Sequence, residues 1–121
     1  MNSQFAKYGS GLVFCWLLAC SSVPPPTDQV ALAKSAVNDA ISAGAAEAAP
    51  AELATAQSKI EGMNKALLAE DNSVARRLAE QAQVDARIAA VKARSAKADK
   101  AAQEIEQSNS VLRDEINRTR R

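Results

Sequence analysis

The chain has 121 residues, of which 47% are hydrophobic and only 3% aromatic, and it carries a formal charge of +1 without any histidine. All four aromatic residues lie within the first 19 positions, and the other 102 residues hold 25 alanines but only 19 larger aliphatic side chains. Such a chain cannot bury a sizeable globular core. Its alanine, glutamate, lysine, arginine and glutamine favour long helices that pack through small faces.

The residue content also excludes the usual catalytic and metal-binding sites. No histidine is present to act as a base or a metal ligand, and the sequence contains neither a Gly-rich phosphate loop nor a Ser-x-x-Lys motif. The adjacent carboxylates at 70–71 and 114–115 point about 100° apart on a helix, so neither pair forms an acid–base dyad. We therefore expect no enzyme activity, no catalytic residue, no bound metal and no free cofactor.

The start of the chain has the pattern of a secretory signal. A basic residue precedes the nine-residue apolar run GLVFCWLLA at 11–19, which is too short to span a bilayer. The run closes on a sequence that resembles the bacterial lipobox, Leu17-Leu18-Ala19-Cys20. This resemblance implies that 1–19 is a signal peptide and that Cys20, acylated with diacylglycerol and palmitate-type chains, becomes the first residue of the mature protein. The alternative is an ordinary signal peptide cut elsewhere, or a short uncleaved anchor.

The residues around Cys20 also predict a location. Resemblance to lipoproteins that are sorted by the residue after the cysteine implies the outer membrane for Ser21, with the protein facing the periplasm. The covalent lipid on Cys20 is then the expected membrane contact, at ~0.8 kcal/mol per buried CH₂. Residues 20–27 form a tether, because the prolines at 24–26 favour polyproline II and hold the folded part within roughly 20 Å of the membrane.

Residues 28–121 are predicted to form one alanine-rich helical domain. Its first helix is capped by Thr27 or Asp28 and ends near Gly44, and its face combines alanines with three larger residues, Val30, Val37 and Ile41. A second helix begins with Pro50 at its first position, and its apolar stripe has a full helical period: Leu53, Ala56, Ile60, Met63 and Leu67. Gly62 interrupts this helix and is expected to let a neighbouring helix approach closely.

A third helix is predicted from the break at 70–73, where Asp71, Asn72 or Ser73 can cap, to about Thr119. About 47 residues would be ~70 Å long, with 108–110 as the place where the helix is most prone to bend. Apolar or small residues recur at spacings of four and three, a heptad pattern that indicates a supercoiled partner: Val84, Ile88, Val91, Ser95, Ala98, Ala102, Ile105, Asn109, Leu112 and Ile116. The shorter helices are expected to cover the first part of this stripe.

The later part of the stripe extends past any cover from the shorter helices and is predicted to bind a second copy of the chain. These positions are Ala98, Ala102, Ile105, Asn109, Leu112 and Ile116. Asn109 lies at an a-type position, where a polar residue fixes register and favours two strands. We expect a weak homodimer, with another envelope protein as the alternative partner.

The charge distribution favours folding back of the long helix. Residues 20–71 carry a net charge of −4 and residues 72–121 a net charge of +4, so an antiparallel hairpin brings opposite charges together. The predicted fold is all-α, a helical hairpin or three-helix bundle with a long coiled-coil-like C-terminal helix. The basic stretch at 87–100 leaves open a contact with anionic cell-wall polymer or lipopolysaccharide. Nucleic acid is excluded as a partner, because stacking aromatics are absent.

Two family resemblances bear on function. AGAAEAAPAELATA at 43–56 and ARRLAEQAQVDARIA at 75–89 are similar to the uncharacterised lipoprotein domain catalogued as domain of unknown function 4398, whose members carry a lipobox, a Pro-rich start and an alanine-rich helix. That family has no established activity. From the lipobox and the coiled-coil-like helix together, we expect a structural or protein-interaction role in the cell envelope. ALLAEDNSVARRLAEQA at 66–82 resembles one tetratricopeptide unit, which implies as the alternative a small adaptor or chaperone-like module that binds a peptide.

Overall fold

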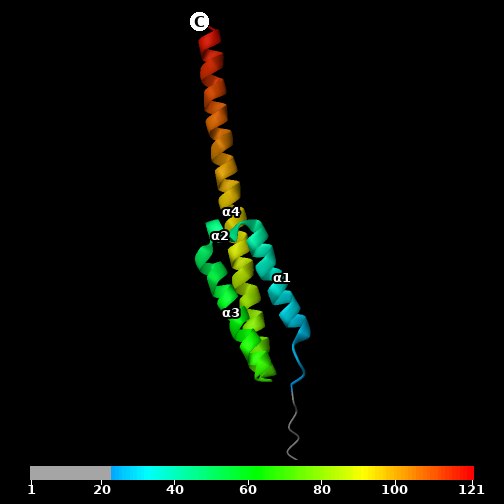
Figure 1. Ribbon diagram of the computed structural model, residues 1–121. Helices are drawn as coiled ribbons and strands as arrows, with labels where there is room; N and C mark the ends of the chain where they lie inside the picture. The colour runs from blue at the N-terminus through cyan, green and yellow to red at the C-terminus, as the bar shows by residue number, and fades with distance from the viewer. Residues whose placement is uncertain (1–22) are drawn as a thin grey trace, which may run out of the picture.

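A computed structural model describes residues 23–121, and this part of the chain is all-α (Figure 1). Its helices are α1 (Thr27–Ala43), the single-turn α2 (Ala45–Ala48), α3 (Pro50–Leu68) and α4 (Asn72–Thr119). Helices α1 and α3 both pack along the N-terminal half of α4, whereas its C-terminal half extends alone beyond them (Figure 1). The structure therefore confirms the predicted three-helix bundle with a long C-terminal helix. None of the described helices is long and apolar enough to cross a membrane.

The start of α1 differs from the prediction. Thr27 is the first helical residue, Pro26 occupies the cap position, and no side chain caps this end. The backbone N–H of Thr27 donates to the Pro25 carbonyl over 2.9 Å, and the N–H of Val30 donates to the Pro26 carbonyl over 3.0 Å. The Val30 bond is the first ordinary bond of the helix. Pro26 has no N–H and the Thr27 N–H is taken by Pro25, so two of the four N–H positions that a helix start leaves without an intrahelical partner need no side-chain cap.

The other helix ends follow the sequence signals. Helix α1 ends at Gly44, whose φ of 93° is left-handed, and α3 begins with Pro50 at its first turn. Asp71 caps α4, because its Oδ1 accepts the Val74 N–H over 3.1 Å. The alanine-rich segment between Gly44 and Pro50 forms α2. A left-handed glycine, an N-terminal proline and a capping side chain each act through the conformation of a few neighbouring residues. The helix ends that depend on them could therefore be located from the sequence.

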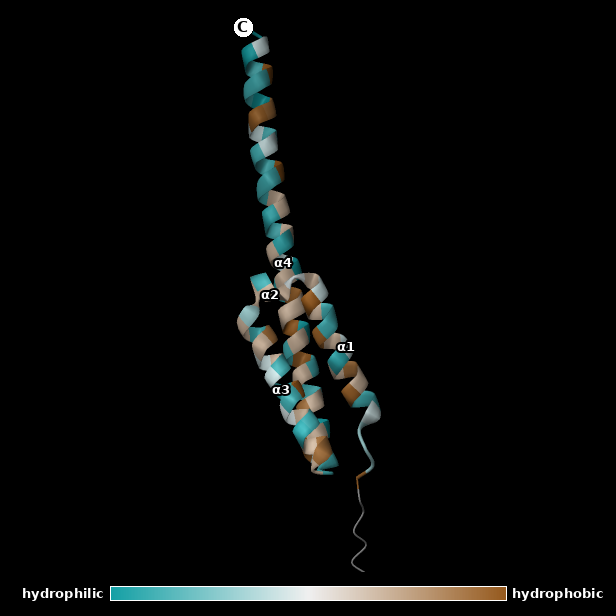
Figure 2. Ribbon diagram, viewed as in Figure 1, coloured by the Kyte–Doolittle hydropathy of each residue, from teal (hydrophilic) through white to brown (hydrophobic). Residues whose placement is uncertain are grey.

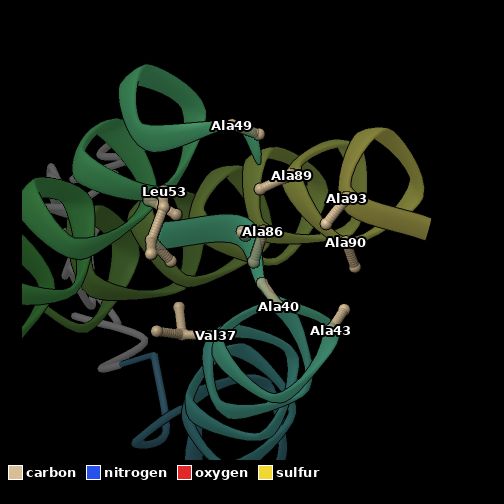
Figure 3. Packing of buried hydrophobic residues seen from close by; sticks show 11 residues of the cluster. Val37, Ala40, Ala43, Ala49, Leu53, Ala86, Ala89, Ala90 and Ala93 are labelled. Carbon is tan, nitrogen blue, oxygen red and sulfur yellow. The ribbon is translucent and has the colours of Figure 1, made fainter. Parts of the chain in front are cut away.

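Alanine forms most of the core. Of the sixteen buried hydrophobic residues in the described part of the chain, thirteen are alanine and the others are Val37, Leu53 and Met63. Figure 3 shows one of the two core clusters, in which Leu53 of α3 and Val37 of α1 pack with alanines of α4. Because the methyl side chain of alanine is small, α1 and α3 can both pack at a short distance from the α4 backbone. The core is correspondingly thin.

Two further expectations about the bundle have different outcomes. The stripe predicted on α3 is confirmed, with Leu53, Ala56 and Met63 buried and Ile60 packed against the core. Gly62 packs against Leu78 of α4, as predicted for a close approach: a Cβ added at residue 62 would lie 3.3 Å from the Leu78 Cδ1. On α1, however, Ile41 is 47% exposed. The inward face of α1 consists instead of Ala33, Val37, Ala40 and Ala43, because it must fit against the small-residue face of α4.

Candidate interaction surface on the long helix

Helix α4 has two apolar faces. One contains its buried residues, all of them alanines: Ala75, Ala79, Ala82, Ala86, Ala89, Ala90 and Ala93. The other contains the ten heptad positions predicted above, from Val84 to Ile116, and every one of them is exposed. We call this second set the outer stripe. At 100° per residue, its bundle section lies on the opposite side of α4 from the alanines, so it faces solvent.

This arrangement corrects one expectation. The periodicity predicts that the shorter helices cover the first part of the outer stripe, but Val84, Ile88 and Val91 are 55%, 44% and 63% exposed. Helices α1 and α3 lie on the alanine side instead. The physical reason is that two helices pack against α4 at once, and a wide face of methyl groups admits both at short distance.

The outer stripe continues without a break into the part of α4 that extends beyond the bundle, residues 98–119, which we call the arm. Three of its larger side chains are exposed to similar degrees, Ile105 at 62%, Leu112 at 60% and Ile116 at 54%. Figure 2 shows hydrophobic segments of ribbon between hydrophilic ones along the arm. The helix does not break at 108–110, where the Ser108 and Ser110 hydroxyls donate to the carbonyls of Glu104 and Gln107. The six arm positions predicted to bind a partner are thus all accessible.

Charged residues flank the outer stripe on both sides where it crosses the bundle. On the α3 side, Lys59 donates to Asp85 over 2.5 Å and Lys92 donates to Glu52. On the α1 side, Arg94 forms a bidentate pair with Asp39 at 2.8 and 3.0 Å. Two of these three pairs have the acid on a short helix and the base on α4, as the charge distribution predicts.

The Lys92 contact has an electrostatic effect on its partner. The hydrogen bond from Lys92 holds the pKa of the Glu52 carboxyl below its ordinary value. Both side chains keep partial exposure, at 54% for Lys92 and 28% for Glu52, so this pair remains open to a further charged group. Of the predicted basic stretch, Lys92 and Arg94 are therefore engaged within the bundle. The Lys97 side chain lies over Gly44, and a Cβ added at residue 44 would lie 3.3 Å from the Lys97 Nζ.

The predicted lipid-attachment site lies outside the described residues. This applies to Cys20 and to the lipobox residues Leu17, Leu18 and Ala19. The structure does describe the point where the tether joins the bundle. There the Asn72 side-chain amide donates to the Val23 carbonyl over 2.8 Å, at the N-terminal end of α4. Within residues 23–121, no group of three or more acidic or cysteine side chains is arranged to hold a metal ion.

Comparison with known proteins identifies a family. A family model described as "Domain of unknown function (DUF4398)" matches residues 28–105. The matched segment contains the bundle except for the first residue of α1, together with about the first third of the arm, and it ends at Ile105 within the outer stripe. No curated protein and no solved structure matches the chain. The chain belongs to the DUF4398 family.

Proposed function

We propose that this protein is a bacterial lipoprotein of the outer membrane, anchored through lipid on Cys20, facing the periplasm and acting as a structural or protein-interaction element of the cell envelope. Three sequence features support the anchor, in the order that a lipoprotein requires: an apolar run, the Leu17-Leu18-Ala19-Cys20 segment and a Pro-rich tether. The family match adds no activity to this proposal, since the function of that domain is unknown.

The observation that carries the interaction role is the accessibility of the outer stripe along the whole arm. Most of the stability of a helix in a protein comes from packing of its apolar face, whereas the arm extends beyond α1, α2 and α3 (Figure 1) and all of its residues are exposed. An apolar stripe with heptad spacing stabilises such an arm only when a partner covers it. The proposed partner is a second copy of the chain.

The arm and the tether lie at opposite ends of α4. The tether meets the bundle beside Asn72, and the chain ends beyond Thr119. A helix of 48 residues is about 72 Å long. A protein anchored by Cys20 can therefore present the arm far from its own anchoring point.

The anchor is tested by metabolic labelling of the full-length chain with an alkynyl fatty acid. Cys20→Ser is expected to abolish labelling and to leave the chain unprocessed or released from the membrane, because the acylated thiol is lost. Cys15→Ser is the matched control, since that cysteine lies inside the apolar run, and it is expected to label as the wild type does. Equal labelling of Cys20→Ser and the wild type would contradict the proposal.

A further inference from the structure

We propose that two copies of this chain pair antiparallel along the outer stripe, so that the arm of each copy covers the exposed bundle section of the other. This inference rests on the proposed self-association and adds its direction, its register and the ion pairs that set both. The starting observation is that the outer stripe has an exposed section on the bundle, at Val84, Ile88 and Val91, and another on the arm, at Ile105, Leu112 and Ile116. Antiparallel pairing brings the two kinds of section together.

The heptad spacing defines one register that uses the whole stripe. Reading Val84 as a d position makes Ile88 an a position, and an antiparallel pair then places each a residue opposite a d residue of the second copy. With full overlap, residue numbers in each layer add to 200. The five distinct layers, each occurring twice, are Val84 with Ile116, Ile88 with Leu112, Val91 with Asn109, Ser95 with Ile105, and Ala98 with Ala102.

This register shortens the run of small layers at the middle of the stripe, because only the two adjacent Ala98–Ala102 layers lack a larger side chain. Ser95, a small residue, lies opposite Ile105, and the largest residues at the two ends of the stripe face one another. Parallel pairing would place each residue opposite its own copy, which leaves three consecutive thin layers at Ser95, Ala98 and Ala102. Parallel pairing gains one feature in return, the opportunity for two Asn109 side chains to hydrogen-bond. Three consecutive layers of small side chains lose more van der Waals contact energy than one hydrogen bond between the two asparagines would supply.

The flanking charges favour the antiparallel direction more strongly. In an antiparallel pair, e positions face e positions and g positions face g positions. At the register defined above, three charged residues of each bundle then face an opposite charge on the arm of the second copy: Asp85 with Arg113, Arg87 with Glu115 and Lys92 with Glu106. Each pair occurs twice. The single like-charged contact is Asp99 with Asp99 at the centre.

Parallel pairing gives a poorer balance of charges. There, each g residue faces the e residue five positions later on the second copy. Attractive pairs join Arg94 with Asp99 and Glu115 with Arg120, whereas repulsive pairs join Arg87 with Lys92 and Glu80 with Asp85. Attraction and repulsion are equal in number, against six attractive contacts and one repulsive contact in the antiparallel pair.

The bundle charges are already arranged to accept these contacts. Lys92 is held by Glu52, and Asp85 is held by Lys59, yet Asp85 keeps 23% of its side chain exposed and Lys92 keeps 54%. An arm from the second copy would extend each pair into a row of alternating charge, with Glu106 beside Lys92. Such rows are more favourable than isolated surface pairs, because each charge is placed by a neighbour before the partner arrives.

Antiparallel pairing also separates the two tethered ends. The register places the Asn72 residues of the two copies 56 positions apart along the paired helices, which corresponds to about 84 Å. Tethers of roughly 20 Å each then reach one membrane surface when the long axis of the dimer lies along it.

The direction is tested by zero-length carbodiimide cross-linking of the wild-type full-length chain in mild detergent, followed by peptide mass spectrometry. We expect an isopeptide bond between Lys92 and Glu106. Within one chain these residues lie 14 positions apart on a continuous helix, about 21 Å, so their cross-link joins two copies. The Lys92–Glu52 cross-link forms inside each bundle and serves as the internal control. Its presence without the Lys92–Glu106 product would overturn the proposal.

Two charge reversals on the arm separate the possible directions. Arg113→Glu is expected to weaken association by roughly five-fold or more and to reduce the Lys92–Glu106 product, because residue 113 faces Asp85 of the second copy. Arg120→Glu makes the same change of charge outside the antiparallel register and is expected to have little effect. The reverse result, sensitivity to Arg120→Glu alone, would overturn antiparallel pairing but leave self-association standing. A wild-type chain that stays monomeric at all concentrations would overturn both.

Discussion

The side chains that hold the bundle together are mostly methyl groups, and this determines how each position responds to change. Gly62 lies where α3 approaches Leu78 of α4. A Cβ added at residue 62 would lie 3.3 Å from the Leu78 Cδ1. Leu78 and Leu67 are half-buried and pack against the core cluster that contains Met63, which is fully buried. Because each alanine contributes little, the few larger side chains carry a disproportionate share of the apolar contact.

Gly44 is the residue whose conformation most restricts substitution. Its φ of 93° is a left-handed conformation that costs an alanine about 1–2 kcal/mol, and a Cβ there would also touch the Lys97 side chain. Gly44→Ala is therefore expected to lower the free energy of unfolding by about that amount, measured by thermal or urea denaturation followed by circular dichroism. Gly44→Asn is the matched control and is expected to lose less, since asparagine tolerates this conformation better. Equal stability of Gly44→Ala and the wild type would show that α1 does not end as described.

Among the helices, the N-terminal end of α4 is expected to make the stability of the protein depend on pH. Hydrogen bonds from the Val74 N–H and the Ser73 hydroxyl hold the pKa of Asp71 below its ordinary value. A folded-state pKa that is lowered contributes stability above the unfolded pKa of about 4, and that contribution is lost as pH falls through the lowered value. The Tm is therefore expected to fall as pH is reduced below about 4.

Asp71→Asn separates the cap from the other carboxylates. Asparagine caps a helix without titrating in this range, so its Tm is expected to depend less steeply on pH than that of the wild type. The Glu52 carboxyl, whose pKa is also lowered, contributes a remaining slope in both proteins. Identical pH profiles for the two proteins would mean that Asp71 does not cap α4 through its carboxylate.

The elements differ in how far sequence alone could predict them. The ends at Gly44 and Pro50 follow from local conformational rules and are confirmed. Of the three residues predicted as possible caps of α4, Asp71 is the one that caps it. The inward face of α4 could not be chosen in the same way, because its two faces share one period. Apart from Ala90, the buried alanines are themselves spaced by four and three from Ala75 to Ala93, with the same period as the residues of the outer stripe. Only the presence of two packed neighbours, α1 and α3, makes the smaller face the inward one.

The same ambiguity limited prediction of the candidate surface. The six arm positions from Ala98 to Ile116 were found from periodicity, and the structure leaves all of them accessible. The periodicity did not distinguish them from Val84, Ile88 and Val91, which the bundle also leaves exposed. A usable signal was present in the alanine row. Its small side chains match the small faces of α1 and α3, whereas the stripe of valine and isoleucine has no comparable counterpart within the chain.

At the scale of the whole molecule, the bundle and the arm have different sources of stability. Helices α1 and α3 stabilise the first half of α4 through buried apolar contact, and Figure 1 shows that neither reaches the second half. The arm has helical propensity and a few local hydrogen bonds, but its apolar side chains gain nothing without a partner. We therefore propose that self-association through the outer stripe is what stabilises the arm.

Sedimentation equilibrium of the full-length chain, over a wide concentration range in mild detergent, tests that claim most directly. The wild type is expected to pass from monomer to dimer as concentration rises, and Ile105→Glu is expected to stay monomeric because it places a charge in the apolar stripe. Val111→Glu is the matched control, since Val111 is also 62% exposed but lies on the other face of α4, and it is expected to dimerise as the wild type does. A wild-type chain that stays monomeric throughout with a fully helical arm, or equal loss of the dimer in both variants, would contradict the account.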